Sequence, residues 1–234
     1  MAGEIIKTKG VCLDIRAWSK TSHVVAWLTP KGRVATVVKG AVRPKSQFLG
    51  QYDLNYTCET LYYARARGEV HALREVAALN RRDALRDDYR ALALAGYFRR
   101  LAAELSPTGS EAEEWYDALE SALDRLASTG REPLTAQLLV FEMRVLEMMG
   151  LSPNIASSGG EISLRGERKM PVSAEVAACL LSPAAEKNLN ILLDAARVIG
   201  VFYQFHVDCA SDVRRTVLGM ISKNNQKVEG KDER

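Results

Sequence analysis

The residues best suited to bind a charged ligand form one short basic segment. Lys39-Gly40-Ala41-Val42-Arg43-Pro44-Lys45-Ser46 follows a predicted strand and contains three cations. The glycine allows a ligand to approach the backbone closely, and the proline stiffens the segment. Lys and Arg side chains in such a loop bind phosphate groups through charge and N–H donors. An isolated basic octapeptide is more often a solvated surface loop, so the wider charge pattern has to decide between the two interpretations.

The charge pattern around this segment favours a polyanion as the partner. Residues 1–82 hold 14 Lys and Arg against 6 Asp and Glu, a formal charge of +8, whereas residues 83–234 hold 18 against 23, a charge of −5. Residues 15–52 contain no acidic residue, and their seven basic residues are Arg16, Lys20, Lys31, Arg33, Lys39, Arg43 and Lys45. A stretch of one sign this long predicts binding to nucleic acid.

Aromatic residues are interleaved with these cations, namely Trp18, Trp27, Phe48 and Tyr52. Single-stranded nucleic acid is commonly held by base stacking beside a cationic groove. Trp27 shares a strand face with His23, opposite three apolar residues, which predicts an indole on the outside of the fold. There it would either stack on a base or pack against a neighbouring domain, and the sequence leaves both open.

The remaining polar residues indicate no catalytic chemistry. The acidic pairs Asp87-Asp88 and Glu113-Glu114 fall in the predicted first turns of helices, where the helix dipole favours negative charge. A nuclease built on Asp87, Asp88 or Glu113 is the weakest alternative. The four cysteines stand singly without CxxC spacing, so neither a zinc site nor a disulfide framework is expected. We therefore predict no catalytic residue, no metal, no cofactor and no enzymatic activity.

Two kinds of hydrophobic pattern must position the basic segment, and they change near residue 82. Alternating runs predict strands near 5–15, 23–29, 33–39, 52–63 and 69–75, with hairpin turns at 30–32 and 65–68. Five strands in about 75 residues predict a small closed barrel. Arg33 and Lys39 then share one strand face. Helical periodicity follows at 94–105, 115–126 and 134–148, with further helices at about 173–181, 184–206 and 211–222.

The predicted architecture is α+β. A five-stranded barrel domain at 1–82 precedes an α-helical domain at 83–222, with an irregular insertion or short hairpin at 152–171 and a flexible tail at 223–234. The chain of 234 residues is 47% hydrophobic and 26% charged, as in ordinary globular proteins. No stretch approaches 18 uninterrupted apolar residues and no secretory segment is seen, so we expect a cytoplasmic protein with no membrane partner.

The sequence resembles the RecO family of bacterial DNA repair and recombination mediators. The most specific match is Thr29-Pro30-Lys31-Gly32-Arg33 followed by residues 38–46, close to the family's hairpin and basic loop. Supporting matches are Trp18-Ser19-Lys20-Thr21-Ser22, Gly68-Glu69, and Phe141-Glu142-Met143-Arg144 with Leu146, Gly150, Leu151 and Pro153. By position, Lys39, Arg43 and Lys45 match the family's basic loop, and Arg33 matches its hairpin arginine.

This resemblance implies an N-terminal OB-fold domain followed by an α-helical domain. It also implies that the protein binds single- and double-stranded DNA and anneals complementary strands. With RecR, and in many bacteria RecF, it would load RecA onto DNA coated by single-strand binding protein, in association with the nucleoid. Many members carry a four-cysteine zinc module after the segment that matches residues 150–153. Here that stretch has only Cys179, so the resemblance implies a member without zinc, with residues 154–171 in place of the module.

The predicted DNA-contacting residues are Arg16, Lys20, Lys31, Arg33, Lys39, Arg43, Lys45 and Trp27. Two other functions stay open on the sequence alone. An RNA-binding barrel is one, because small five-stranded barrels also bind RNA and no residue here identifies a 2′-hydroxyl reader. The other is a protein-interaction adapter whose basic face meets an acidic protein and never touches nucleic acid.

Overall fold

The computed structural model describes residues 4–65, 70–109, 111–128, 132–155, 160–164, 168–207 and 211–222. The chain divides into two compact units, the first formed by Met1–Asp83 with Arg99–Asp124 and the second by Ala84–Phe98 with Arg125–Arg234. The change from the first five strands to helices falls close to residue 82, as predicted, yet the unit that contains these five strands also takes in residues 99–124.

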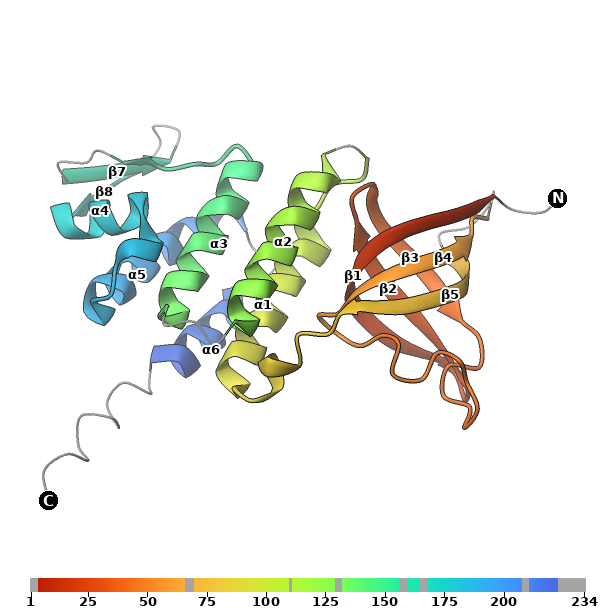
Figure 1. Ribbon diagram of the computed structural model, residues 1–234. Helices are drawn as coiled ribbons and strands as arrows, with labels where there is room; N and C mark the ends of the chain where they lie inside the picture. The colour runs from red at the N-terminus through yellow and green to blue at the C-terminus, as the bar shows by residue number, and fades with distance from the viewer. Residues whose placement is uncertain are drawn as a thin grey trace, which may run out of the picture. The chain divides into compact units, whose positions relative to one another are not determined.

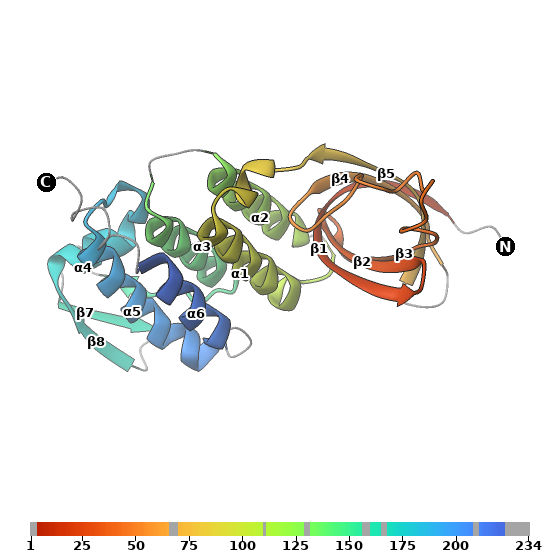
Figure 2. The same ribbon diagram turned by 90° about the horizontal axis from the view of Figure 1, so that it is seen from below.

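A closed barrel of five strands forms the larger part of the first unit (Figure 1). The strands are β1 (Ile5–Ser19), β2 (Ser22–Thr29), β3 (Gly32–Val38), β4 (Thr57–Tyr63) and β5 (Val70–Asn80). They close in the order β1-β2-β3-β5-β4, with β3 parallel to β5 and β1 long enough to pair with both β2 and β4. Figure 2 shows these strands as a ring. The predicted closed barrel is therefore confirmed, with the connectivity of an OB-fold.

Alternate side chains of the strands fill the barrel interior. The buried residues of this core include Cys12, Val25, Val38, Cys58 and Leu73. Burial raises the pKa of the Cys58 thiol to about 12 and raises that of Cys12 well above its ordinary value. Both thiols therefore stay protonated at neutral pH and act as small apolar packing groups.

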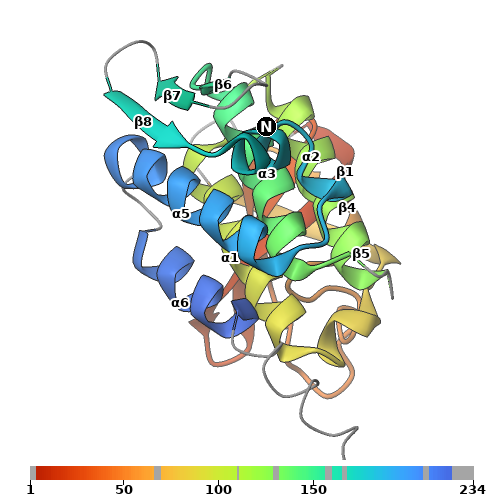
Figure 3. The same ribbon diagram turned by 90° about the vertical axis from the view of Figure 1, so that its left-hand side faces the viewer.

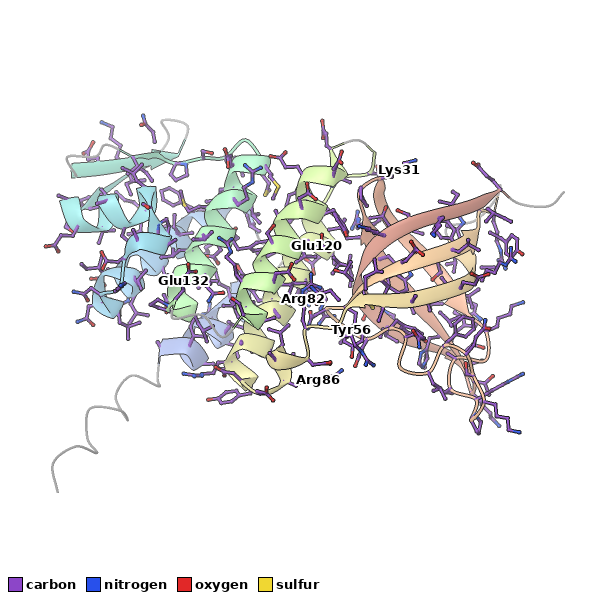
Figure 4. The ribbon with its side chains drawn as sticks, in the orientation of Figure 1. Lys31, Tyr56, Arg82, Arg86, Glu120 and Glu132 are labelled. Atoms are coloured by element: carbon purple, nitrogen blue, oxygen red, sulfur yellow. The ribbon has the colours of Figure 1, made fainter. Side chains whose placement is uncertain are left out.

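Helical residues 99–124 belong to this unit through contacts with the barrel. They comprise the end of α1 (Tyr89–Leu105) and most of α2 (Ala112–Ala127). The buried guanidinium of Arg82 donates to Asp124 Oδ1 over 2.6 Å, to the Asn55 carbonyl over 2.7 Å and to Thr57 Oγ1 over 2.9 Å. Figure 4 shows Arg82 between Tyr56 of the barrel and Glu120 of α2. One buried cation thus fixes α2 against the barrel.

The second unit is mainly helical. Besides the start of α1, it contains α3 (Leu134–Met148), α4 (Ala174–Leu181), α5 (Leu189–His206) and α6 (Ser211–Ser222), and the short 3-10 turn η1 (Asp83–Arg86) leads into it. Helices α5 and α6 lie side by side (Figure 3). Helix α5 begins later than the predicted residue 184, because η2 (Pro183–Ala185) is a separate 3-10 turn and Asn188 caps α5 through the Asn190 N–H.

A buried ion pair holds the helices of the second unit together. The Arg214 guanidinium of α6 binds both carboxylate oxygens of Glu142 in α3, at 2.7 and 2.9 Å. Tyr97 of α1 donates its hydroxyl to the same carboxylate over 2.7 Å. In α5, Gly200 leaves room for this arginine, because a Cβ there would lie 2.5 Å from Arg214 Nη1. Three helices thus converge on one carboxylate.

The insertion at 152–171 contains a small sheet and is not irregular. Strands β6 (Asn154–Ile155), β7 (Gly160–Leu164) and β8 (Arg168–Val172) form an antiparallel sheet in that order. The hairpin alternative is the correct one for β7 and β8. The sequence pattern of this hairpin was weak because few of its residues face a core. Ile162 is the one fully buried side chain among those described in these strands.

Some predictions lie outside the described residues. These are most of the hairpin turn at 65–68, with the Gly68-Glu69 match, and the tail at 223–234. Within the described ranges, no helix is both long and apolar enough to span a membrane.

Candidate nucleic-acid interface

The predicted basic segment belongs to an ordered loop between β3 and β4. The backbone N–H groups of Arg43, Ser46 and Leu49 each donate to the carbonyl three residues earlier, at 3.2, 2.9 and 3.3 Å. Gly40 has a φ of 70°, and a Cβ at this position would lie 3.2 Å from Arg43 Cδ. Both the left-handed backbone and the close approach of Arg43 therefore favour glycine there. The loop presents its cations from a defined backbone.

Hydrogen bonds attach this loop to the turn between β1 and β2. The Gly40 N–H donates to Ser22 Oγ over 3.3 Å, and the Val42 N–H donates to the Thr21 carbonyl over 3.3 Å. Between them, Ala41 is buried in the barrel core. Lys20, which lies in the β1–β2 turn, is consequently held beside the basic loop although it is far from it in sequence.

A depression of about 450 Å³ lies where the turn and the loop meet. Its lining residues are Trp18, Ser19, Ser22, Val37, Lys39, Gly40 and Arg43. Lys20, Lys39, Arg43 and Lys45 are exposed, and within the described part of the chain none of them forms an ion pair. We call these four residues the basic patch. Unpaired ammonium and guanidinium groups keep their donors available for phosphate oxygens.

The other predicted cations lie elsewhere or are already engaged. Lys31 lies in the β2–β3 turn, at the barrel end opposite the basic loop (Figures 1 and 4). Arg33 pairs across from Leu28 and donates to the Ala103 carbonyl of α1. Six residues along the chain separate Arg33 from Lys39, a span of about 20 Å in an extended strand. Their shared strand face therefore does not bring them together.

Arg16 does not line the depression, and its charge already has a partner. It is exposed on β1, where its guanidinium forms an ion pair with Asp14 over 2.5 Å. This partner offsets its charge locally. Of the seven predicted cations, the four of the basic patch have no ion pair among the described residues, whereas Lys31 lies at the far end of the barrel and Arg33 and Arg16 already have partners.

The prediction for Trp27 is wrong. Its side chain is 1% exposed and lies inside the barrel, where the indole N–H donates to Thr36 Oγ1 over 2.9 Å. It neither stacks on a ligand nor packs against another domain. Strand alternation failed here because both faces of β2 are covered at this point, as Leu28 on the opposite face is fully buried too. The apolar face was therefore mistaken for the interior.

The acidic residues have structural roles. Asp88 precedes α1 and caps it by accepting the Arg90 N–H over 2.8 Å, one residue before the helix in which it was predicted. Hydrogen bonds from the Arg90 side chain lower the pKa of Asp88. Glu113 lies in the first turn of α2, as predicted. Among the described residues, no three or more His, Cys, Asp or Glu side chains are grouped so that they could hold a metal ion.

Two features were missed at the level of sequence. Trp18 was only one of four interleaved aromatics, yet it is 69% exposed and lines the depression. Its place two residues before the β1–β2 turn was the available signal, since residues close to the turns of a barrel are accessible. The sequence did not indicate that Arg82 is buried. It is the second of two adjacent arginines at the boundary between strands and helices, and such a pair is typical of an exposed linker.

A closed barrel with OB-fold connectivity, followed by a helical unit, defines the structural class of this protein. The family described as "Recombination protein O C terminal" matches residues 86–188. The DNA repair protein RecO of Desulforudis audaxviator (strain MP104C) is 28% identical over 155 residues, which are 66% of this chain and 60% of that protein. The DNA repair protein RecO of Xanthomonas oryzae pv. oryzae (strain PXO99A) is 34% identical over 146 residues, 62% of this chain and 58% of that protein.

A further relative, the DNA repair protein RecO of Roseiflexus sp. (strain RS-1), is 25% identical over 176 residues, 74% of this chain and 61% of that protein. The chain thus aligns with about three fifths of the length of these relatives. The family match covers helical residues from 86 to 188, and the chain is therefore similar in its helical part to the RecO family.

Proposed function

We propose that this protein is a DNA-binding mediator of repair and recombination that acts without turnover of a substrate. The observation that carries the proposal is the basic patch at one end of an OB-fold barrel. Its four cations are exposed and form no ion pair within the described ranges, and two of them, Lys39 and Arg43, line the depression. Similarity to relatives that are named DNA repair proteins supports DNA as the polyanion. Electrostatic binding of this kind recognises the phosphate backbone and so depends on salt.

The same arrangement supports a proposed role in strand annealing. Two complementary strands repel each other through their phosphates, and a shared cationic surface lowers that repulsion. Contacts to phosphates leave the base edges free to pair. We therefore propose that the basic patch binds single- and double-stranded DNA and brings complementary strands together, without a catalytic group.

Protein partners are assigned to the helical part of the chain. Residues 83–234 carry a formal charge of −5, opposite in sign to the barrel region, so they compete less with the patch for DNA. In this proposal RecR, with or without RecF, and the single-strand binding protein dock there, and RecA is loaded onto DNA as the outcome. The association with the nucleoid during repair follows from DNA binding.

The direct test is a titration of a labelled single-stranded DNA oligonucleotide with the full chain, followed by fluorescence anisotropy at several salt concentrations. With three or four phosphate contacts, log affinity should fall against log salt with a slope of about −2 to −3, at about −0.7 per contact. Absence of binding at low salt would refute the proposal and favour the protein-interaction adapter. Tighter binding to an RNA oligonucleotide of matched sequence would favour the RNA-binding barrel.

A further inference from the structure

Of the four aromatic side chains in the acid-free stretch, one is largely exposed and three are buried or partly buried. Trp27 is buried in the barrel core. Phe48 packs partly against that core, and Tyr52 does the same while its hydroxyl lies 2.8 Å from His23 Nδ1. Trp18 is 69% exposed. An indole with so large an exposed fraction presents a broad apolar face to solvent. Exposed tryptophans use this face for contacts with ligands or partner proteins.

The surroundings of Trp18 combine that face with positive charge. Trp18 lies near the end of β1 and lines the depression with Lys39 and Arg43, and none of the residues that line it is acidic. Ser22 and Gly40 also line it, and the hydrogen bond between them fixes the two walls relative to each other. The depression therefore offers a stacking surface next to two phosphate donors on a preformed backbone.

We infer that the Trp18 indole stacks on an unpaired base of single-stranded DNA while Lys39 and Arg43 hold the adjacent phosphates. This inference rests on the proposed function and adds a reason for the protein to prefer single-stranded over duplex DNA. Bases in a duplex are stacked on one another and offer no free face, whereas an unpaired base can be placed on an aromatic ring whatever its identity. Trp18 thus raises affinity for single strands, and the cations of the basic patch serve both forms of DNA.

The test compares three variants with the unchanged protein on an oligothymidylate, a duplex of equal length and a base-free sugar-phosphate oligomer. Trp18→Ala should weaken oligothymidylate binding by roughly 5- to 100-fold, the range that stacking on one base supports. Binding to the duplex and to the base-free oligomer should change by less than about twofold. Trp18→Phe keeps a ring and should restore most of the affinity. Tyr89→Ala, which removes an aromatic that is 67% exposed on α1, is the matched control and should change nothing.

Intrinsic fluorescence gives a second readout that does not depend on affinity. Of the three tryptophans, Trp27 and Trp115 are buried, so quenching by added oligothymidylate reports on Trp18. Quenching should occur in the unchanged protein and disappear in Trp18→Phe, although that variant still binds.

Two results would overturn the inference while leaving the proposed function intact. One is equal loss of single-strand and duplex binding in Trp18→Ala, and the other is unchanged oligothymidylate affinity without quenching. In both cases the unchanged protein still binds DNA with the expected salt dependence. If the unchanged protein binds none of the three probes, the proposed function fails together with the inference.

Discussion

The backbone N–H of Gly40 donates a hydrogen bond to Ser22 Oγ over 3.3 Å, and this contact joins the two segments that carry the basic patch. Without it, the loop after β3 and the turn before β2 would be tied by the bond between Val42 and Thr21 alone among the hydrogen bonds described there. The arrangement of the cations therefore depends on a few backbone contacts.

Replacement of Gly40 by alanine tests this dependence. A residue with φ of 70° is strained when it carries a Cβ, at a cost of about 1–2 kcal/mol. The new methyl would also displace Arg43, whose Cδ lies 3.2 Å away. We expect a lower free energy of unfolding in urea and a several-fold loss of affinity for single-stranded DNA. Gly219→Ala, at a helical position with open space, is the control. It should raise the free energy of unfolding by about 0.5–1 kcal/mol, because alanine favours the helix, and should leave the affinity for DNA unchanged.

The combined variant Lys39→Ala, Arg43→Ala, Lys45→Ala should lose DNA binding without losing stability. These side chains are exposed and, within the described ranges, have no ion pair, so their removal leaves no orphaned partner. The slope of log affinity against log salt should become shallower by about 2, for three contacts at about 0.7 each. Lys31→Ala, at the far end of the barrel, should leave the slope unchanged. An unaltered slope in the triple variant would contradict this assignment of the site.

Arg82→Ala should destabilise the barrel unit strongly. It would leave the Asn55 carbonyl and Thr57 Oγ1 without their donor and Asp124 without its nearest cation. Loss of such buried, charge-assisted bonds costs about 2–4 kcal/mol, measured by urea unfolding. The neighbouring Arg81→Ala should cost less than about 1 kcal/mol, because Arg81 is exposed and donates to the Gly50 carbonyl at the surface. Equal effects of the two changes would argue against the role of Arg82.

The Glu142–Arg214 pair makes a prediction for the helical unit. Removing one partner, as in Glu142→Ala, leaves a buried guanidinium unpaired and should lower the free energy of unfolding by about 3–5 kcal/mol. Replacing both, as Glu142→Leu with Arg214→Met, should cost less than the single change, since no buried charge then lacks a partner. If the double variant loses as much stability as Glu142→Leu and Arg214→Met lose separately in sum, this account is contradicted.

Tyr52 makes a prediction at alkaline pH. Burial raises the pKa of Tyr52 to about 12, from an ordinary value near 10. Because the folded state favours the neutral phenol, this contribution to stability is present below pH 10 and is lost as pH rises from 10 towards 12. The difference in unfolding free energy between the unchanged protein and Tyr52→Phe should therefore shift in favour of the variant across that interval. A difference that is constant with pH would contradict the raised pKa.

The sequence determined the elements because they depend on local pattern. Alternation over 23–29 and 33–39 predicted β2 and β3 within about one residue, and the helical stripe over 134–148 matched α3. Gly150 follows the C-cap of α3 with φ of 67°, and the Leu151 N–H donates to the Leu146 carbonyl over 2.7 Å. Each of these features is set by residues within one or two turns of each other.

What only the tertiary structure decided was which side chains share a surface and which are buried. Alternation along a strand defines two faces but does not identify the interior, and Trp27 lies beside Leu28 where both faces are covered. Antiparallel pairing of β2 with β3 places Lys20 beside the basic loop and Lys31 at the far end of the barrel, although all three belong to one acid-free stretch. Charge in a sequence is counted along the chain, whereas a ligand meets it in space. Strand pairing and burial therefore decide which cations and which tryptophan a strand of DNA can reach.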